Sequence, residues 1–262
     1  MALHAGTSGF SYPAWKGTFY PKDMKEADFL RHYAAKLDTV EINSTFYRMP
    51  RRSVLAAWRE KVGPSFIFVL KASRRITHHA KLEDTEETVE YFWSVAQELG
   101  PRLGPVLFQL PPYLRKDTER LARFLESLPP GMRAVLEFRH PSWFEDDETL
   151  VLLRDHGATL CFSDVDPSDD SDPGLDQPFE RTSEFGYVRL RRERYRPEDL
   201  EAWVARIRAH AWKEVFVFFK HETTGPELAQ MLTRLWADAP RAAKERAPST
   251  GKRARGTSVH RA

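Results

Sequence analysis

Residues 105–138 read PVLFQLPPYLRKDTERLARFLESLPPGMRAVLEF and contain the repeating unit that decides the fold. Two short apolar runs, 105–110 and 134–138, have the length and composition of buried strands. The segment between them, 118–127, has the pattern of a helix with one apolar face. A strand, a helix and a second strand in this order predict a parallel pair joined by a right-handed crossover.

The same alternation extends outward from this unit in both directions. The predicted strands are 3–6, 39–43, 66–71, 105–110, 134–138, 159–164, 186–190 and 214–220. The predicted helices are 25–36, 53–61, 85–99, 118–127, 148–155, 197–209 and 226–237. Eight such units predict the α/β class and a single (β/α)8 TIM-like barrel. No glycine-rich dinucleotide fingerprint follows any strand, which argues against a doubly wound sheet.

One step of the alternation departs from the pattern. Between the sixth and seventh strands no clear helix is visible, and residues 165–184 hold seven acids against one base. The prolines and the glycine in this stretch indicate an exposed loop. We therefore expect an acidic loop to replace, or to precede, the helix at this position.

Composition and charge narrow the class of protein. The chain is 41% hydrophobic and 30% charged, as in a folded protein with a large core. The longest apolar run, 215–219, is far too short for a membrane span, and no secretory signal precedes the first strand. The single cysteine excludes an internal disulfide framework, so we expect a cytoplasmic protein without a membrane partner.

The basic residues are concentrated at the C-terminal end of the chain. Residues 241–262 carry seven bases and one acid and have no apolar period, which predicts a disordered basic tail after a barrel domain at 1–240. Such a tail can attract nucleic acid by counterion release. The alternative is a solvated extension that aids solubility.

The strands end in polar residues, at the end of a barrel where enzymes of this fold have their active sites. Glu41 lies between Val40 and Ile42, and Glu137 is flanked by large apolar residues in the same way. Because alternate residues of a strand share a face, these neighbours can face the helices. We therefore expect Glu41, Glu137 and Arg139 to point into the barrel mouth, where unpaired charges would be costly and one ionic network should form.

The candidate site combines these charges with neighbouring polar and aromatic side chains. Candidate catalytic residues are Glu41, Glu137 and Asp164. Candidate substrate-binding residues lie at strand ends and in the loops that follow: Ser8, Tyr12, Trp15, Asn43, Phe46, Tyr47, Lys71, His78, Gln109, Arg139, His140, Trp143, Arg189, Lys220 and His221. Aromatic rings beside basic residues can stack a nucleobase or a sugar, and the alternative is that these rings pack the barrel rim.

The function that these residues favour is an enzyme, a hydrolase among the options, acting on a phosphorylated or otherwise anionic small substrate. Arg139, Arg189 and Lys71 would bind the anion. Glu137 or Glu41 would act as general acid or base.

The sequence leaves the cofactor unknown, and a divalent metal is an option that it does not favour. Glu41, Glu137, Asp164 and His221 offer hard ligands, but the strands supply one histidine where metal-dependent barrels usually use several. Cys161 lies mid-strand and is expected to be buried rather than nucleophilic.

Two other functions stay open. One is a non-catalytic barrel that binds nucleic acid through rim aromatics and the basic tail. The other is glycoside hydrolysis by Glu41 and Glu137, for which the many basic residues at the mouth suit a neutral sugar poorly. Reaction type, substrate identity and oligomeric state do not follow from the sequence.

Several motifs resemble those of the YecE-like family, domain of unknown function 72. They occur in the family's order between residue 2 and about residue 237: 6–12 with Trp15, Gly17 and 19–21; 39–47; 68–71 with Thr77 and His78; 109–111; and 137–143. The resemblance implies a TIM-like barrel whose biochemical activity is not established. Residues 219–222, Phe-Lys-His-Glu, depart from the Phe-Asn-Asn-like string expected there, and the tail from Arg241 lies outside the resemblance.

Overall fold

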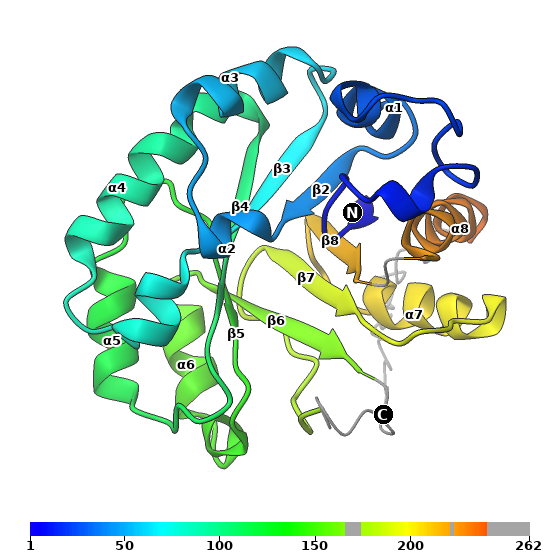
Figure 1. Ribbon diagram of the computed structural model, residues 1–262. Helices are drawn as coiled ribbons and strands as arrows, with labels where there is room; N and C mark the ends of the chain where they lie inside the picture. The colour runs from blue at the N-terminus through cyan, green and yellow to red at the C-terminus, as the bar shows by residue number, and fades with distance from the viewer. Residues whose placement is uncertain (166–173, 221–222, 240–262) are drawn as a thin grey trace, which may run out of the picture.

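The computed structural model describes residues 1–165, 174–220 and 223–239. Eight parallel strands form a closed barrel in which each strand pairs with its neighbours in sequence, and the last pairs with the first (Figure 1). The strands are β1 (Ala2–Thr7), β2 (Thr39–Ile42), β3 (Ile67–Lys71), β4 (Leu103–Gln109), β5 (Ala134–Glu137), β6 (Thr159–Asp164), β7 (Phe185–Leu190) and β8 (Glu214–Phe219). The predicted barrel is confirmed, with strand ends that differ by one or two residues.

Helices surround the barrel (Figure 1). The α-helices are α1 (Phe29–Ala34), α2 (Ser44–Tyr47), α3 (Arg52–Glu60), α4 (Glu86–Ala96), α5 (Thr118–Glu126), α6 (Glu148–Asp155), α7 (Pro197–Arg208) and α8 (Gly225–Asp238). Shorter turns are the 3-10 helices η1 (Pro13–Trp15), η2 (Glu26–Asp28), η4 (Gln97–Arg102) and η5 (Pro141–Phe144), and the π-helical η3 (Arg75–His79).

The acidic loop lies where the sequence predicts it, between β6 and β7. Residues 174–184 form neither helix nor strand. Residues 166–173, which carry four of the acids, and the basic tail from Arg241 lie outside the described residues. None of the described helices is long and apolar enough to cross a bilayer.

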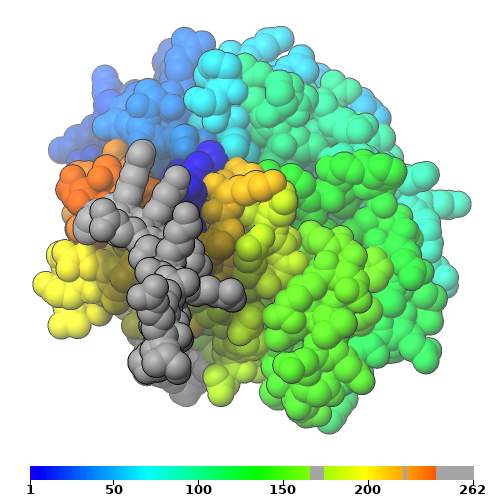
Figure 2. All heavy atoms as spheres, turned by 180° about the vertical axis from the view of Figure 1, so that it is seen from behind, coloured from blue at the N-terminus to red at the C-terminus, as the bar shows by residue number. Residues whose placement is uncertain are grey.

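Closure of the barrel brings the two ends of the fold together. Ala2 is opposite Glu214 and Thr7 is opposite Phe219 in the β1–β8 pair. Viewed from behind, the blue N-terminal residues accordingly lie beside the orange segments from the other end of the described chain (Figure 2).

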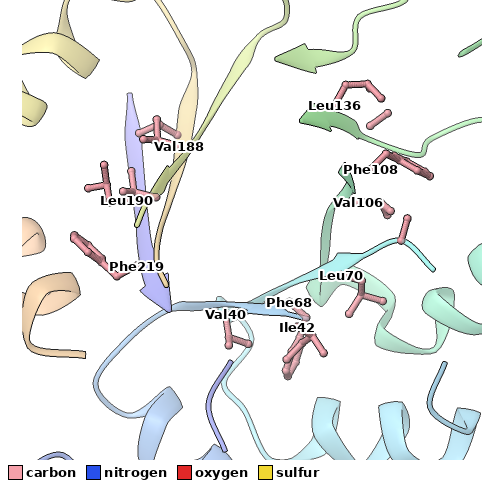
Figure 3. Packing of buried hydrophobic residues seen from close by; sticks show 14 of the residues in the cluster. Val40, Ile42, Phe68, Leu70, Val106, Phe108, Leu136, Val188, Leu190 and Phe219 are labelled. Carbon is pink, nitrogen blue, oxygen red and sulfur yellow. The ribbon is translucent and has the colours of Figure 1, made fainter. Parts of the chain in front are cut away.

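Side-chain alternation divides the core into two layers. Apolar residues on the outer face of the strands pack against the helices (Figure 3), among them Val40, Ile42, Phe68, Leu70, Val106, Phe108, Leu136, Val188, Leu190 and Phe219. A second cluster fills the barrel itself: Val69, Leu107, Val135, Cys161, Phe185, Tyr187, Phe216 and Phe218. Cys161 is fully buried, as expected, and burial raises the pKa of its thiol.

The N-terminal end of the barrel is closed by side chains. The Arg133 guanidinium lies 4.1 Å from the centroid of the Phe185 ring and forms a 2.7 Å ion pair with Glu214. His4 stacks on Phe216 with 4.9 Å between ring centroids. This end is therefore packed, as expected for the face of a TIM barrel that serves stability, and the polar residues at the other end become the candidates for function.

Gly6 marks the closest approach of β1 to β2. A methyl group on Gly6 would lie 2.1 Å from the carbonyl oxygen of Thr39, the residue opposite it in the strand pair. We expect Gly6→Ala to lower the free energy of unfolding by about 1–3 kcal/mol or more, because two backbones must separate. Urea unfolding followed by circular dichroism measures the change.

Gly63→Ala is the matched control, since nothing lies within 4 Å of the methyl group that it would add. Equal unfolding midpoints for the two variants would contradict the close packing of β1 on β2.

Candidate functional site at the barrel mouth

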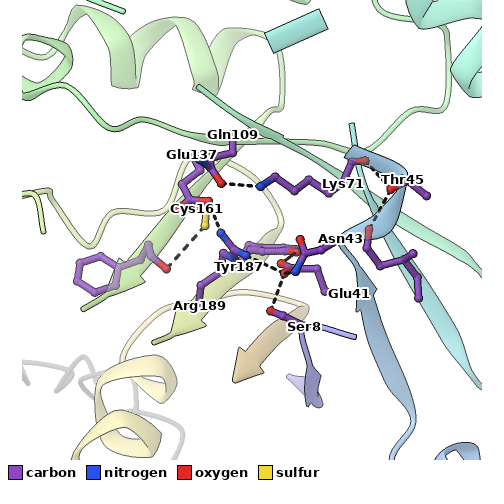
Figure 4. A network of polar contacts seen from close by, with 12 residues as sticks. Ser8, Glu41, Asn43, Thr45, Lys71, Gln109, Glu137, Cys161, Tyr187 and Arg189 are labelled. Carbon is purple, nitrogen blue, oxygen red and sulfur yellow. Dashed lines mark hydrogen bonds and ion pairs between the residues drawn. The ribbon is translucent and has the colours of Figure 1, made fainter. Parts of the chain in front are cut away.

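Arg189 of β7 is the centre of a buried ionic network at the C-terminal end of the barrel (Figure 4). Its Nη1 donates to Glu137 Oε2 at 2.7 Å, and its Nη2 donates to Glu41 Oε1 at 2.9 Å. Arg139 forms a second ion pair with Glu137, 2.6 Å between Nη2 and Oε1. The predicted network of Glu41, Glu137 and Arg139 is confirmed, and Arg189 is the residue that joins the two carboxylates.

Glu41 is fully buried and is surrounded by hydrogen-bond donors from three other residues. Oε1 accepts from Ser8 Oγ at 2.7 Å and from Asn43 Nδ2 at 3.2 Å. Oε2 accepts from the hydroxyl of Tyr187 at 2.6 Å. Since both oxygens have partners, this carboxylate is held in one position by contacts from the residues that directly follow β1 and β2 and from β7.

Both carboxylates stay ionised at neutral pH. Burial alone would raise the pKa of Glu137, but Arg139 and Arg189 outweigh it and lower the pKa well below its ordinary value. Burial acts in the same direction on Glu41, and there Arg189 and the hydrogen bond from Ser8 lower the pKa. Neither group can therefore donate a proton near pH 7.

Lys71, at the end of β3, has a different environment. Its Nζ donates to Gln109 Oε1 at 2.7 Å and lies 4.2 Å from the centroid of the Phe46 ring. Among the described residues no carboxylate is within ion-pair distance of this ammonium group. Burial, followed by repulsion from Arg189, lowers the pKa of Lys71 to about 8.

Phe46 is held above Lys71 by the short helix α2. Thr45 Oγ1 donates to the carbonyl oxygens of Ile42 at 2.9 Å and of Lys71 at 2.6 Å, which ties α2 to β2 and β3. Phe46 also contacts His78 edge-on, with 4.9 Å between ring centroids. Phe46, Lys71, His78 and Gln109 thus lie together on one side of the mouth, and their role in substrate binding stays a prediction.

Two more bases lie on this end of the barrel. Lys220 follows β8, and partial desolvation of its ammonium by the surrounding protein, together with repulsion from Arg191 and Arg189, lowers its pKa. Arg191 follows β7 and helps to lower the pKa of Glu137. His221 lies outside the described residues.

Polar atoms with unused hydrogen-bonding capacity also gather here. Asn43 Oδ1, Ser163 Oγ and Arg189 Nε are buried and have no partner in the part of the chain that the structure describes. Ser163 is opposite Arg189 in the β6–β7 pair. Since buried polar atoms normally have partners, this concentration indicates a place where a polar ligand can bind.

Asp164 does not join the network. It lies on the opposite face of β6 from Cys161 and Ser163, and its carboxylate accepts from Arg192 Nη2 at 2.8 Å and from the hydroxyl of Tyr195 at 3.0 Å. The catalytic assignment of Asp164 is therefore corrected: its contacts hold the segment that follows β7.

Four predicted binding residues near the mouth take part in local packing or hydrogen bonds. Trp15 and Trp143 are each 1% exposed, so neither ring can stack on a ligand. Trp143 donates from Nε1 to the carbonyl oxygen of Leu114 at 2.9 Å. The other two hold local turns: the Tyr12 hydroxyl donates to the carbonyl oxygen of Ser8 at 2.6 Å, and His140 Nδ1 accepts from the Ser142 amide at 3.1 Å.

Tyr187 and Arg191 belong to the site although they were not among the candidates. Both carry a signal in the sequence, because they lie two residues before and two residues after Arg189 and so share its face of the strand. Tyr187 is hard to recognise as a site residue, because an aromatic residue in a strand usually belongs to the core. Its ring does pack in the core inside the barrel.

The donor set argues against a metal at the predicted carboxylates. Glu41 and Glu137 direct their oxygens at Arg189, and Asp164 lies elsewhere. In residues 1–165, 174–220 and 223–239 no group of three or more His, Cys, Asp or Glu side chains is arranged to hold a metal ion.

The family whose sequence pattern matches this barrel is described as "Protein of unknown function DUF72", and the match covers residues 4–252. The chain belongs to the DUF72 family. The match extends past residue 237, where the sequence resemblance was expected to end, and into the basic segment after residue 240. Membership of this family does not assign an activity to the chain, because the family is described as being of unknown function.

Curated relatives of this DUF72 chain are themselves named without an activity. It is 31% identical to the UPF0759 protein YecE of Escherichia coli K12 over 170 residues, which is 63% of this chain and 60% of YecE. It is 27% identical to the UPF0759 protein YunF of Bacillus subtilis over 153 residues, 53% of this chain and 54% of YunF. The aligned region thus spans less than two thirds of either relative.

Solved structures of the DUF72 family have the same architecture. A DUF72 protein from Thermotoga maritima superposes with a TM-score of 0.76 at 26% identity, covering 91% of this chain and all of that one. A DUF72 protein from Enterococcus faecalis gives a TM-score of 0.74 at 17% identity, with 94% of this chain and all of that one covered. The second likeness supports the fold alone.

Removing the charge of Arg189 should leave the buried Glu41 without an ion-pair partner among the described residues, while Glu137 keeps its ion pair with Arg139. We expect Arg189→Met to lower the free energy of unfolding at pH 7 by about 3–5 kcal/mol. In this variant burial raises the pKa of Glu41, so the loss should shrink as the pH falls toward 5 and this group takes up a proton. Urea unfolding at both pH values measures the effect.

The wild-type chain should respond to pH in the opposite way. The lowered pKa values of Glu41 and Glu137 stabilise it at neutral pH, and this stability is lost as the pH falls below about 4. An equal loss of stability in Arg189→Met at pH 7 and at pH 5 would count against the buried pairing.

Proposed function

We propose that this DUF72 protein is an enzyme that acts on a small phosphorylated or otherwise anionic substrate at the barrel mouth. The observation that carries the proposal is the Lys71 ammonium, a partly buried cation held by a neutral amide and an aromatic ring rather than by a carboxylate. A substrate anion would supply the opposite charge that this group lacks among its described neighbours.

The charge around Lys71 supports an anionic rather than a neutral ligand. The described residues of the mouth comprise five bases, Lys71, Arg139, Arg189, Arg191 and Lys220, and two buried acids, Glu41 and Glu137. Both acids are bonded to Arg189. A phosphate or carboxylate of a ligand is therefore attracted to this end of the barrel.

Lys71 is also the group best suited to move a proton. An amine with a pKa of about 8 is present in both protonation states near neutral pH, which is what general acid–base catalysis requires. Glu41 and Glu137 are fixed in the ionised form and so position Arg189 instead. Gln109 and Phe46 hold the Lys71 amine at one place.

The same electrostatics disfavour glycoside hydrolysis by Glu41 and Glu137. That reaction needs one carboxyl group with a raised pKa that protonates the leaving oxygen. Here the arginines lower the pKa of both. An anionic substrate with Lys71 as the proton-transfer group fits the observed contacts better.

Anion binding should depend on the charge of Lys71. We expect sulfate, whose charge is constant over the range, to bind most tightly below pH 7 and more weakly as the pH rises through 8, because Lys71 loses its proton. Lys71→Met should weaken binding about ten- to hundred-fold and remove the step near pH 8. Isothermal titration calorimetry from pH 6 to 9 measures both effects.

Lys36→Met is the matched control. Lys36 also lies over a phenylalanine ring, 5.6 Å from the centroid of Phe19, but it is exposed and precedes β2 at the opposite end of the barrel. Sulfate binding that is equally strong in Lys71→Met and in Lys36→Met would refute the proposed site.

Turnover of a substrate should also depend on Lys71. In a screen of phosphate monoesters and small carboxylates, we expect any substrate that is converted to lose conversion in Lys71→Met, with circular dichroism and unfolding midpoint retained. Where Lys71 acts as the base, kcat should rise with pH through about 8, and where it acts as the acid kcat should fall. A kcat that is unchanged in Lys71→Met would exclude both roles.

A further inference from the structure

Three loops on one side of the mouth form a surface that we call the basic rim: residues 43–51 after β2, 72–81 after β3 and 110–115 after β4. Within these bounds there is no acid, and the acids of the same loops, Glu83, Asp84 and Asp117, follow directly after them. The rim contains six bases: Arg48, Arg51, Arg74, Arg75, Lys81 and Arg115. Since the whole chain carries a net charge of only +2, the rim concentrates positive charge far beyond the average of the protein.

All six rim bases are exposed, and none forms an ion pair with any carboxylate that the structure describes. Several bases elsewhere on the surface are paired. Arg52 lies 2.9 Å from Glu98, and Lys213 lies 2.6 Å from Glu184. The rim therefore presents its charge to solvent, where it can attract the phosphates of a polyanion.

Two exposed tyrosines stand among these bases. Tyr47 is 70% exposed and Tyr113 is 61% exposed, while most large aromatic residues of the chain are buried. Each ring has a cation nearby: the Arg74 guanidinium lies 5.9 Å from the centroid of Tyr47, and Lys81 Nζ lies 5.7 Å from the centroid of Tyr113. An aromatic face beside a cation is the element that binds an unpaired base together with its phosphate.

The three loops are connected through His78. Its ring contacts Phe46, and Phe46 contacts Tyr47 edge-on with 5.0 Å between centroids. The Tyr113 hydroxyl lies 3.5 Å from the carbonyl oxygen of His78. Since Phe46 also covers Lys71, the basic rim is continuous with the mouth.

The middle loop has a strained backbone. Arg75–His79 forms a π-helical turn, and after it Lys81, Leu82 and Asp84 have positive φ angles of 54°, 72° and 47°. Non-glycine residues in this conformation cost free energy, and such strain and π-turns are concentrated at functional sites. Here the strained segment contains Lys81, the cation beside Tyr113.

We propose that the basic rim binds single-stranded nucleic acid, with bases stacked on Tyr47 and Tyr113 and phosphates bound by the surrounding arginines and lysine. Single strands fit because only unpaired bases offer their faces to tyrosine. Duplexes are bound mainly through phosphates and would not use the rings. The rim has its own charges and rings, so this proposal stands apart from the function proposed for the mouth.

Fluorescence anisotropy with a labelled oligothymidylate of about ten nucleotides tests the proposal on the full chain. We expect the double variant Tyr47→Ala, Tyr113→Ala to raise Kd at least about tenfold. Tyr91→Ala is the matched control, because Tyr91 is 63% exposed but lies on α4, outside the rim, and its Kd should equal that of the wild type. Both proteins keep the basic tail, so the difference reports the rim alone.

Measurements of salt dependence and of competition complete the test of the rim proposal. Arg74→Ala should reduce the slope of log Kd against log salt by about 0.7, the value for one phosphate contact on a single strand. A duplex of the same length should bind more weakly than the single strand, and polyglutamate should not compete at equal charge. Equal Kd values for the double variant, Tyr91→Ala and the wild type, or equal binding of duplex and single strand, would overturn the proposal.

The outcomes also separate the rim from the mouth. Sulfate binding should be unchanged in the single variant Tyr113→Ala, and oligothymidylate binding that persists in Lys71→Met would leave the rim proposal intact even if the mouth proposal fails.

Discussion

The pairing of Arg189 with two buried carboxylates is the constraint on which the rest of the mouth depends. Three charges lie where water is excluded, an arrangement that is tolerable only because each charge has close partners. Glu41 and Glu137 come from strands on different sides of β7 in the ring, so the pairing also fixes how the strands converge. Because Arg189 holds both carboxylates, the close partners of the Lys71 ammonium are the Gln109 amide and the Phe46 ring. The anion binding and proton transfer proposed for Lys71 follow from this environment.

The barrel itself was predictable because its signal is local. Apolar residues on both faces of short segments, alternating with amphipathic segments, predict buried parallel strands and covering helices. The inward orientation of Glu41 followed from Val40 and Ile42, which do face the helices. Asp164 was chosen only because it ends a strand, and β6 offers no flanking pair of large apolar residues that would indicate which way its side chain points. Its contacts with Arg192 and Tyr195 depend on tertiary structure.

The sequence alone did not show which side chains are buried or which loops converge, because both depend on tertiary packing. Trp15 and Trp143 have the composition of ligand-stacking residues, and only the packing around them shows that their rings are covered. The basic rim joins segments that are 20 to 60 residues apart in the chain, and no local pattern reports that their charges meet. Loop positions are set by which strands they follow, so the barrel order was needed first.

The hydrogen bonds of Glu41 have a consequence for the order of folding. Its partners include Ser8 in the segment after the first strand and Tyr187 and Arg189 in the seventh, separations of up to 148 residues along the chain. Contacts this distant in sequence form slowly, because long loops must close before they do. During synthesis the Glu41 carboxylate therefore acquires its partners only after most of the chain has been made. The mouth is completed in one of the last steps of folding.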